Sequence, residues 1–338
     1  MGKLAIIGGS GIYAIEEMAS GAVHDLTTPF GQPSGPIFAG KLGETEVLFL
    51  PRHGDGHRLS PSEIPYRANI YALKLLGATH LVSFSAVGSL KEELPPRTLV
   101  MPDQIIDRTG PRARTFFEGG VVAHVGIADP YCSTLQVSLS SAATSRGVDV
   151  QAGGTYVCIE GPQFSTRAES ELFRSWGASV IGMTAMPEAR LAREAELCYA
   201  AVAMVTDYDV WHQGAADVTV EEVVANMQAN GLSALAILQQ MRAAASHQLD
   251  ILAAAADDHL RLRAHRFDHH DFGRQAGRVE QDVLGADAHH GGAPVRIGRM
   301  LPDRPDHAAL GLEAVGADRA LQQIHRGRAD EGGDEEVG

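Results

Sequence analysis

The sequence predicts an α/β fold, because short apolar strands alternate along the chain with segments of helical periodicity. Several of these strands end in glycine, hydroxyl-bearing or charged residues. Ligands of open α/β sheets gather at the carboxyl ends of the strands, so those endings are the first place to look for a site. A chain of 338 residues is also long enough to bury a substantial core.

Composition narrows the class of protein. Apolar residues make up 44% of the chain and charged residues 21%, as in a soluble globular protein. The net charge of −14 argues against a nucleic-acid partner, which would need a basic surface. No secretory segment or membrane-length apolar run is apparent, so we expect a cytoplasmic protein without a membrane partner. The cysteines, Cys132, Cys158 and Cys198, lack C-x-x-C spacing and are expected to be reduced, mostly buried thiols.

The first strand, Leu4–Ile7, runs directly into the glycine-rich loop Gly8–Gly11. Backbone N–H groups in such a loop are not obstructed by Cβ atoms, and the Ser10 hydroxyl adds a donor, so the loop suits a phosphate. Residues 9–14 also fit the G-x-G-x-x-A dinucleotide fingerprint. That alternative needs a helix and then a second strand ending in an acid about 20 residues later, whereas residues 27–36 have the composition of a loop.

The second strand, Glu46–Leu50, ends in the sequence P-R-H-G-D-G-H. An arginine beside a histidine at a strand end can present a planar fork and a ring N–H to one oxyanion. Arg52 and His53 are therefore candidate anion ligands, and His57 is a weaker one.

A helix is predicted for Tyr66–Leu76 and a strand for His80–Phe84. This strand ends in Ser85 and Ala86, whose hydroxyl and backbone N–H would complete an anion cradle. Gly88 is assigned only to the turn that follows. Three strand ends thus favour the same kind of ligand, a small anion.

The middle of the chain contributes candidates for binding a flat molecule. A strand at Gly153–Ile159 leads to Phe164, whose ring can stack on a base, and to Ser165, whose hydroxyl can bond to the edge of that base. His124 lies before this strand in an irregular region, where a lone histidine is usually structural. The remaining elements of this part are predicted as the strand Thr98–Met101, the helix Gln136–Arg146 and the helix Glu169–Trp176.

The next strand-helix-strand unit contains several candidate site residues. A buried strand at Val180–Gly182 presents Met183–Thr184 at its carboxyl end, and a helix follows. The strand Cys198–Val205 then brings Asp207 and Asp209 to the same edge of the sheet. Two acids one residue apart can both face a pocket if the chain turns there, although an isolated D-x-D is more often a turn former.

Taken together, these blocks resemble a known family. The sequence M-T-x-M-P-E-A-x-L-A-x-E from Met183, then C-Y-A from Cys198 and T-D-Y-D-x-W from Thr206, resembles the trimeric purine nucleoside phosphorylases, most closely their 5'-methylthioadenosine phosphorylase branch. The resemblance extends in ordered blocks from the amino terminus to about residue 230. It implies a single domain with a central mixed β-sheet flanked by helices, a homotrimer, and phosphorolysis of 5'-methylthioadenosine to adenine and 5-methylthioribose 1-phosphate. Inorganic phosphate would be a co-substrate, with no cofactor and no metal.

The resemblance also implies residue roles. Phosphate would be bound by Ser10, Arg52, His53, Ser85, Ala86 and Thr184. The nucleoside would be bound by Phe164, Ser165, Met183, Asp207 and Asp209, with His124 reaching the ribose site of a neighbouring subunit and with Val220 and Val223 around the methylthio group. Asp207 would be the acid near N7 of the leaving purine, and Asp209 would favour a 6-amino over a 6-keto group.

Alternatives to this function stay open from the sequence. The nearest is a 6-oxopurine nucleoside or methylthioinosine phosphorylase. A dinucleotide-dependent oxidoreductase and a non-catalytic nucleoside-binding protein represent other classes.

The chain changes character near its end. Residues 1–256 are assigned to the phosphorylase domain, while residues 258–338 contain no Ser, Thr, Lys, Asn, Tyr, Trp or Cys. Paired histidines occur there, but without the regular spacing of a metal site. We expect residues 257–338 to form an atypical, largely disordered tail, in which the family's last helix has no counterpart.

Overall fold

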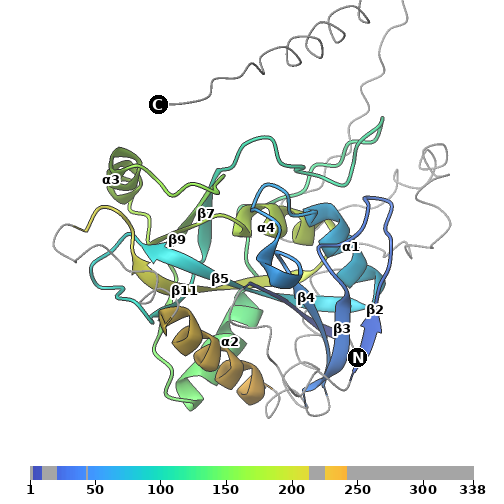
Figure 1. Ribbon diagram of the computed structural model, residues 1–338, viewed down its shortest axis with the longest axis horizontal. Coiled ribbons are helices and arrows are strands. Elements are labelled where there is room, and N and C mark those ends of the chain that lie inside the picture. Colours follow the sequence, from blue (N-terminus) through green and yellow to red (C-terminus); the bar gives the residue numbers. More distant parts are fainter. Residues whose placement is uncertain (1–2, 10–20, 43–44, 213–224, 242–338) are drawn as a thin grey trace, which may run out of the picture. The chain divides into compact units, whose positions relative to one another are not determined.

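The computed structural model describes residues 3–9, 21–42, 45–212 and 225–241 (Figure 1). In this part of the chain eleven strands form one mixed sheet. The strands are β1 (Lys3–Gly8), β2 (Ala22–His24), β3 (Ile37–Leu42), β4 (Thr45–Pro51), β5 (Ala78–Ser89), β6 (Leu99–Met101), β7 (Gln104–Arg108), β8 (Val150–Ala152), β9 (Thr155–Ile159), β10 (Val180–Gly182) and β11 (Cys198–Tyr208).

The long strand β5 is the centre of the sheet. It pairs in parallel with β1 on one side and with β11 on the other. Where β1 ends at Gly8, opposite Phe84, the antiparallel strand β10 takes over on that side and pairs with Gly88 and Ser89. The ends of β1, β4, β5 and β11 therefore reach one edge of the sheet, as expected for parallel neighbours.

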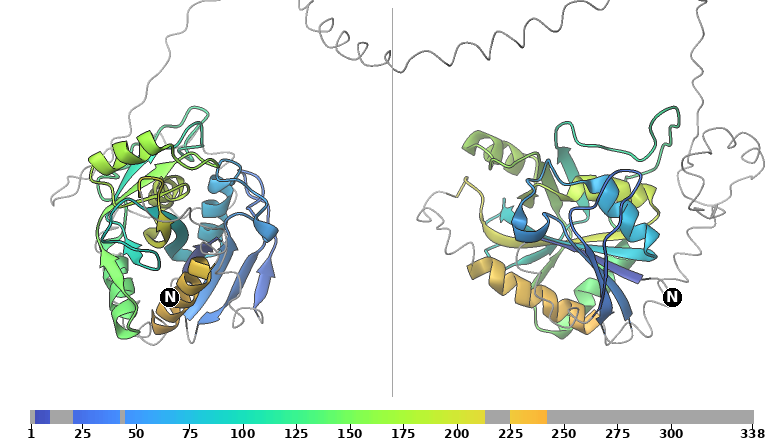
Figure 2. Two further views of the ribbon diagram at one scale, coloured as in Figure 1. Left: turned by 60° about the vertical axis from the view of Figure 1, so that its left-hand side comes forward. Right: turned by 45° about the vertical axis from the view of Figure 1, so that its right-hand side comes forward.

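Helices cover both faces of the sheet (Figures 1 and 2). They are α1 (Tyr66–Leu75), α2 (Ser133–Ser145), α3 (Arg167–Ser175), α4 (Ala185–Glu194) and a helical segment at 225–241. Side chains of a strand alternate between its two faces. Leu4 and Ile6 accordingly pack in a cluster with α2 and the 225–241 helix, whereas Ala5 and Ile7 pack with α1 and α4.

The predicted α/β class, with a mixed sheet flanked by helices, is confirmed. Two strands extend beyond their predicted ends, because β5 continues to Ser89 and β11 to Tyr208. The interpretation of Gly88 as part of a turn is wrong, because Gly88 lies within β5 opposite Asp207. The assignment of residues 257–338 to a disordered tail lies outside the described residues.

The expectation of three reduced cysteines is wrong for two of them. Cys132 and Cys198 form a disulfide, and Cys158 is a buried free thiol. The tertiary packing explains the pairing: Cys132 directly precedes α2, Cys198 begins β11, and α2 packs against β11. The backbone N–H of Cys132 also donates to the carbonyl oxygen of Tyr199 at 2.7 Å. A separation of 66 residues in the sequence gives no hint of this contact.

Among the described helices, none is long and apolar enough to cross a membrane.

Candidate active site

The glycine loop after β1 starts beside the residues that follow β4. A Cβ atom placed on Gly9 would lie 3.8 Å from Nη1 of Arg52 and 3.9 Å from Cδ2 of His53. Gly9 of the proposed phosphate loop therefore lies beside both candidate ligands. Ser10, the hydroxyl predicted for that loop, lies outside the described residues.

Arg52 is fully buried, and its guanidinium already has protein partners. Nε donates to Oε1 of Glu188 at 2.5 Å, and Nη2 donates to Oγ of Ser83 at 2.6 Å. Nη1 donates to the carbonyl oxygen of Phe84 at 2.8 Å. The fork that we expected to face an oxyanion thus faces a carboxylate. Nη1 is the atom of Arg52 that lies nearest Gly9.

His53 has a defined tautomer. Its Nδ1 lies 2.8 Å from the carbonyl oxygen of Leu59, which can only accept, so Nδ1 carries the proton. Burial, followed by the charge of Arg52, lowers the pKa of His53 to about 4. The ring is therefore neutral near pH 7, and Nε2 is an acceptor. His57 stacks on it with ring centroids 4.0 Å apart, and burial and Arg52 lower the pKa of His57 as well.

Hydroxyl groups line the next part of the edge. Oγ of Ser85 is buried and has no hydrogen-bond partner among the described residues. A bound ligand could supply the missing partner. Ala86 is the exposed residue that follows it. Thr184 is the N-cap of α4, yet its side chain makes no capping bond. Two hydroxyls and the amino terminus of a helix are suitable donors for a phosphate.

The register of β10 on β5 accounts for the nearness of these groups. Val180 pairs with Ser89 and Ile181 with Gly88, so the chain after β10 returns along β5 towards Ser85. The side chain of Glu188, one turn into α4, confirms the direction by accepting from Ser83 at 2.6 Å.

Both acids lie beside one glycine. A Cβ on Gly88 would lie 3.4 Å from Oδ1 of Asp207 and 3.3 Å from Cβ of Asp209. Any residue with a Cβ atom at this position would displace one of the acids. Gly88 is therefore needed for the geometry of the site, and not for a turn. Gly88 is three residues past Ser85, so the acids lie beside the same strand, roughly 10 Å along its backbone from Ser85.

A bulge in β11 sets the direction of Asp207. The pairing with β5 shifts between Val205 and Asp207, which frees carbonyl groups from the ladder. The side-chain amides of Asn226 and Asn230 donate to the carbonyls of Thr206 and Val205 at 2.8 and 2.9 Å. The 225–241 helix therefore holds the end of β11 in place.

The environments of the two acids differ. Burial raises the pKa of Asp207, with a smaller opposing effect from the Thr206 hydroxyl, which donates to Oδ2 at 2.7 Å. Asp209 accepts from Oγ of Ser165, also at 2.7 Å. Ser165 and Asp209 were predicted separately as base contacts, and the fold brings them into contact with each other.

The other predicted nucleoside residues are less constrained. Phe164 is 80% exposed, so a base could stack on its ring without displacing a neighbour. His124 is exposed in the irregular segment after β7. Val220 and Val223 lie outside the described residues.

Sequence reasoning missed two buried residues that hold the site. Glu188 lies within the quoted M-P-E block, so an acid in a first helical turn was the available signal. Arg112 donates from Nη1 to the carbonyl oxygen of Met183 at 2.5 Å and to the hydroxyl of Tyr66 at 3.0 Å, and it also bonds to Glu160. In the sequence Arg112 is one of several arginines in an irregular segment, and no pattern there indicates its contact with Met183.

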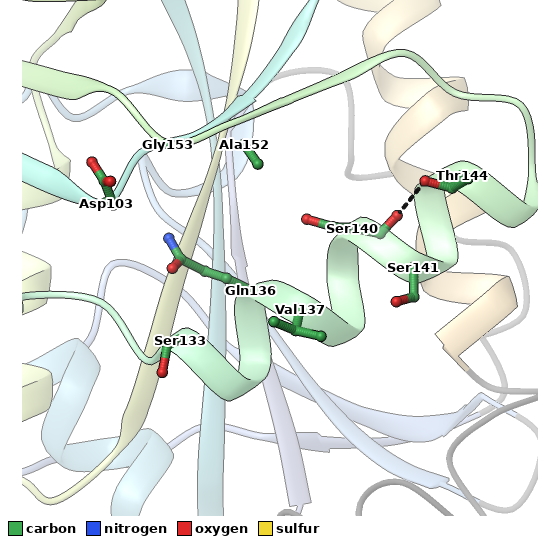
Figure 3. Close-up of a pocket in the computed structure, with 9 residues that line it drawn as sticks. All are labelled: Asp103, Ser133, Gln136, Val137, Ser140, Ser141, Thr144, Ala152 and Gly153. Atoms are coloured by element: carbon green, nitrogen blue, oxygen red, sulfur yellow. Dashed lines mark hydrogen bonds between the residues drawn. The ribbon is translucent and has the colours of Figure 1, made fainter.

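No group of three or more potential metal ligands occurs among the described residues. The pocket shown in Figure 3 lies along α2, away from the candidate active site. Its lining contains none of the predicted site residues: Asp103, Ser133, Gln136, Val137, Ser140, Ser141, Thr144, Ala152 and Gly153.

Comparison with known proteins agrees with this arrangement. Residues 3–242 match the family model described as the phosphorylase superfamily. The S-methyl-5'-thioadenosine phosphorylase of Geobacter sulfurreducens is 52% identical over 237 residues, which cover 70% of this chain and 83% of the relative. That of Chloroflexus aurantiacus is 58% identical over 228 residues, covering 67% of this chain and 79% of the relative.

Solved structures give the same result. A methylthioadenosine phosphorylase from an antarctic soil metagenomic library has a TM-score of 0.69 and 50% identity, covering 73% of this chain and 88% of the other. The methylthioadenosine phosphorylase of Schistosoma mansoni in complex with adenine has a TM-score of 0.69 and 35% identity, covering 76% and 98%. Fold, strand-end residues and sequence similarity agree, and the chain belongs to the phosphorylase superfamily.

Proposed function

We propose that this protein is a pentosyltransferase that cleaves 5'-methylthioadenosine with inorganic phosphate, giving adenine and 5-methylthioribose 1-phosphate. The observation that carries the proposal is the placement of both Asp207 and Asp209 beside Gly88, along the strand from Ser85. The relatives from Geobacter sulfurreducens and Chloroflexus aurantiacus carry the name of this activity. Its products make it an enzyme of purine and methionine salvage.

The chemistry needs stabilisation at both ends of the broken bond. The electrons of the C1'–N9 bond leave with the purine, and an oxygen of phosphate forms the new bond to C1'. A carboxyl group near N7 can give or share a proton with the departing base. Asp207 suits this role because burial raises its pKa, so that it keeps a proton at higher pH than an ordinary aspartate.

Phosphate would lie at the ends of β1 and β4, beside Ser85 of β5. Nη1 of Arg52 and the hydroxyls of Ser85 and Thr184 supply donors there, with the Ser10 loop and the backbone of Ala86. Neutral His53 would accept a hydrogen bond from a protonated phosphate oxygen through Nε2. Holding nucleophile and nucleoside together in one orientation can contribute up to ~7–11 kcal/mol in favourable cases.

Asp209 carries the preference for adenine. Ser165 occupies one of its oxygens, and the carboxylate remains an acceptor for a 6-amino group, directly or through water. A 6-keto oxygen in the same place would meet a second acceptor. This acceptor favours 6-aminopurine nucleosides over the alternative, a 6-oxopurine nucleoside or methylthioinosine phosphorylase.

The assembly and location belong to the same proposal. We place the enzyme in the cytoplasm as a homotrimer, in which exposed His124 reaches the ribose of a neighbouring site. Val220 and Val223 would surround the methylthio group, and Met183 and Phe164 would contact ribose and base. No cofactor takes part.

A phosphate-dependent assay on methylthioadenosine, adenosine and inosine tests the function. We expect methylthioadenosine to be cleaved fastest, with no reaction when phosphate is omitted. Replacing Asp207 with Asn should depress turnover of adenine nucleosides by about 10²-fold or more and that of inosine much less, because only the former depends on the acid. Equal losses on both substrates would contradict the role given to Asp207, and a preference for inosine in the unaltered protein would favour the alternative.

A further inference from the structure

Glu188 is the most heavily bonded buried acid beside the proposed phosphate site. Its side chain is 2% exposed, and it accepts hydrogen bonds from three residues on three different strands or strand ends. Nε of Arg52 lies 2.5 Å from Oε1, while Oγ of Ser83 lies 2.6 Å and the hydroxyl of Tyr199 3.1 Å from Oε2. Nη2 of Arg52 adds a longer bond to Oε2 at 3.3 Å.

These contacts form a closed ring with Arg52. Nη2 donates to Oγ of Ser83 at 2.6 Å, and Ser83 in turn donates to the carboxylate of Glu188. Burial alone would lower the pKa of Arg52, but the Glu188 carboxylate raises it above the ordinary value. The arginine is therefore charged, and two edges of its guanidinium plane are fixed.

Stabilisation of the fold is a weak explanation for the buried ion pair between Arg52 and Glu188. Replacing a buried ion pair with apolar residues of similar volume is often neutral or stabilising. A bidentate pair does, however, fix the plane of a guanidinium. The fixed plane leaves Nη1 bonded to the carbonyl oxygen of Phe84 and next to Gly9 of the glycine-rich loop.

We propose that Glu188 is a positioning residue, which orients Arg52 so that Nη1 is presented to the phosphate co-substrate. The inference rests on the proposed function, because that function supplies the phosphate. The pair is neutral overall, so Arg52 contributes a directed N–H group more than a free positive charge. Phosphate binding then depends on the orientation of Arg52, and nucleoside binding does not.

Glu188→Gln is the test, since glutamine keeps the size of the side chain and one carbonyl acceptor for Nε. The expected result is a rise of about 10- to 100-fold in the KM for phosphate, the range for losing hydrogen bonds to a charged group. The KM for methylthioadenosine should stay within about twofold, and kcat at saturating phosphate should change much less than the KM for phosphate.

Two variants serve as controls. Glu118→Gln makes the same chemical change in an exposed pair, where Glu118 lies 2.6 Å from Nη1 of Arg67, and should leave all constants unchanged. Tyr199→Phe removes one donor to Glu188 but leaves the pair with Arg52 intact, so it should raise the KM for phosphate less than Glu188→Gln does. If Glu188→Gln does not fold, Ser83→Ala opens the ring without removing the carboxylate and should still raise the KM for phosphate selectively.

A thermal melt and a phosphate titration without nucleoside complete the design. A lowered Tm with both KM values unchanged, or a parallel rise of both, would show a merely structural role and overturn the proposal. Weaker phosphate binding by the variant in the titration would support it even if no nucleoside were cleaved by the unaltered protein. That last result would refute the proposed function alone.

Discussion

Replacing Gly88 with Ala should damage the site more than the fold. The added methyl group would lie 3.1 Å from Cγ2 of Ile181, 3.3 Å from Cβ of Asp209 and 3.4 Å from Oδ1 of Asp207. These distances are below or at the limit of ordinary contact, so the neighbours must move by a few tenths of an ångström. Adding a methyl group to a packed site typically costs about 1–3 kcal/mol.

The effect on activity should be larger than this cost suggests. Asp207 would be displaced away from the base, and a misplacement of about 1 Å can lower a rate by about 10²-fold. We therefore expect the kcat/KM for methylthioadenosine to fall by about 10- to 100-fold, while the folded fraction at 25 °C is unchanged.

Steady-state kinetics and urea denaturation measure the two effects separately. Gly126→Ala is a suitable stability control, because a Cβ there would meet nothing within 4 Å. A Gly88→Ala variant with kcat/KM within about twofold of the unaltered protein would refute the argument that Asp207 must lie against Gly88.

Two further predictions concern stability. Reducing the Cys132–Cys198 disulfide, or replacing Cys132 with Ser, should lower the free energy of unfolding by about 4 kcal/mol. This is the chain-entropy value for a closed loop of 66 residues. Thiol titration of the unfolded protein checks the pairing, and three free thiols would contradict it. His53 has a folded pKa of about 4, below its ordinary value, so the native state binds fewer protons than the unfolded chain. It should therefore contribute stability above pH 6.5 that is lost as the pH falls towards 4, about 3 kcal/mol in all. Urea denaturation at pH 7 and pH 5 should show a smaller pH effect in His53→Asn, and an undiminished effect would mean that other groups cause it.

Local pattern was enough for much of the site. Arg52 directly follows β4 and Thr184 lies just after β10, as predicted, because strand ends depend on nearby sequence. The predicted strand end at Phe84 is wrong, because β5 continues to Ser89 and Ser85 lies within it. The roles of these residues remain predictions for the proposed assays. The partners of their side chains depended on packing between distant segments: Glu188 lies 136 residues from Arg52, and Ser165 lies 44 residues from Asp209.

The sequence by itself determined the fold class, the family and the chemical types present at one edge of the sheet, since each follows from local periodicity or from ordered motifs. The tertiary structure alone decided that the fork of Arg52 faces Glu188, that two acids lie beside Gly88, and that Cys132 meets Cys198. Each is a contact between chain segments whose separation carries no periodic signal. Only the register of neighbouring strands and the packing of helices on the sheet fix which side chains meet.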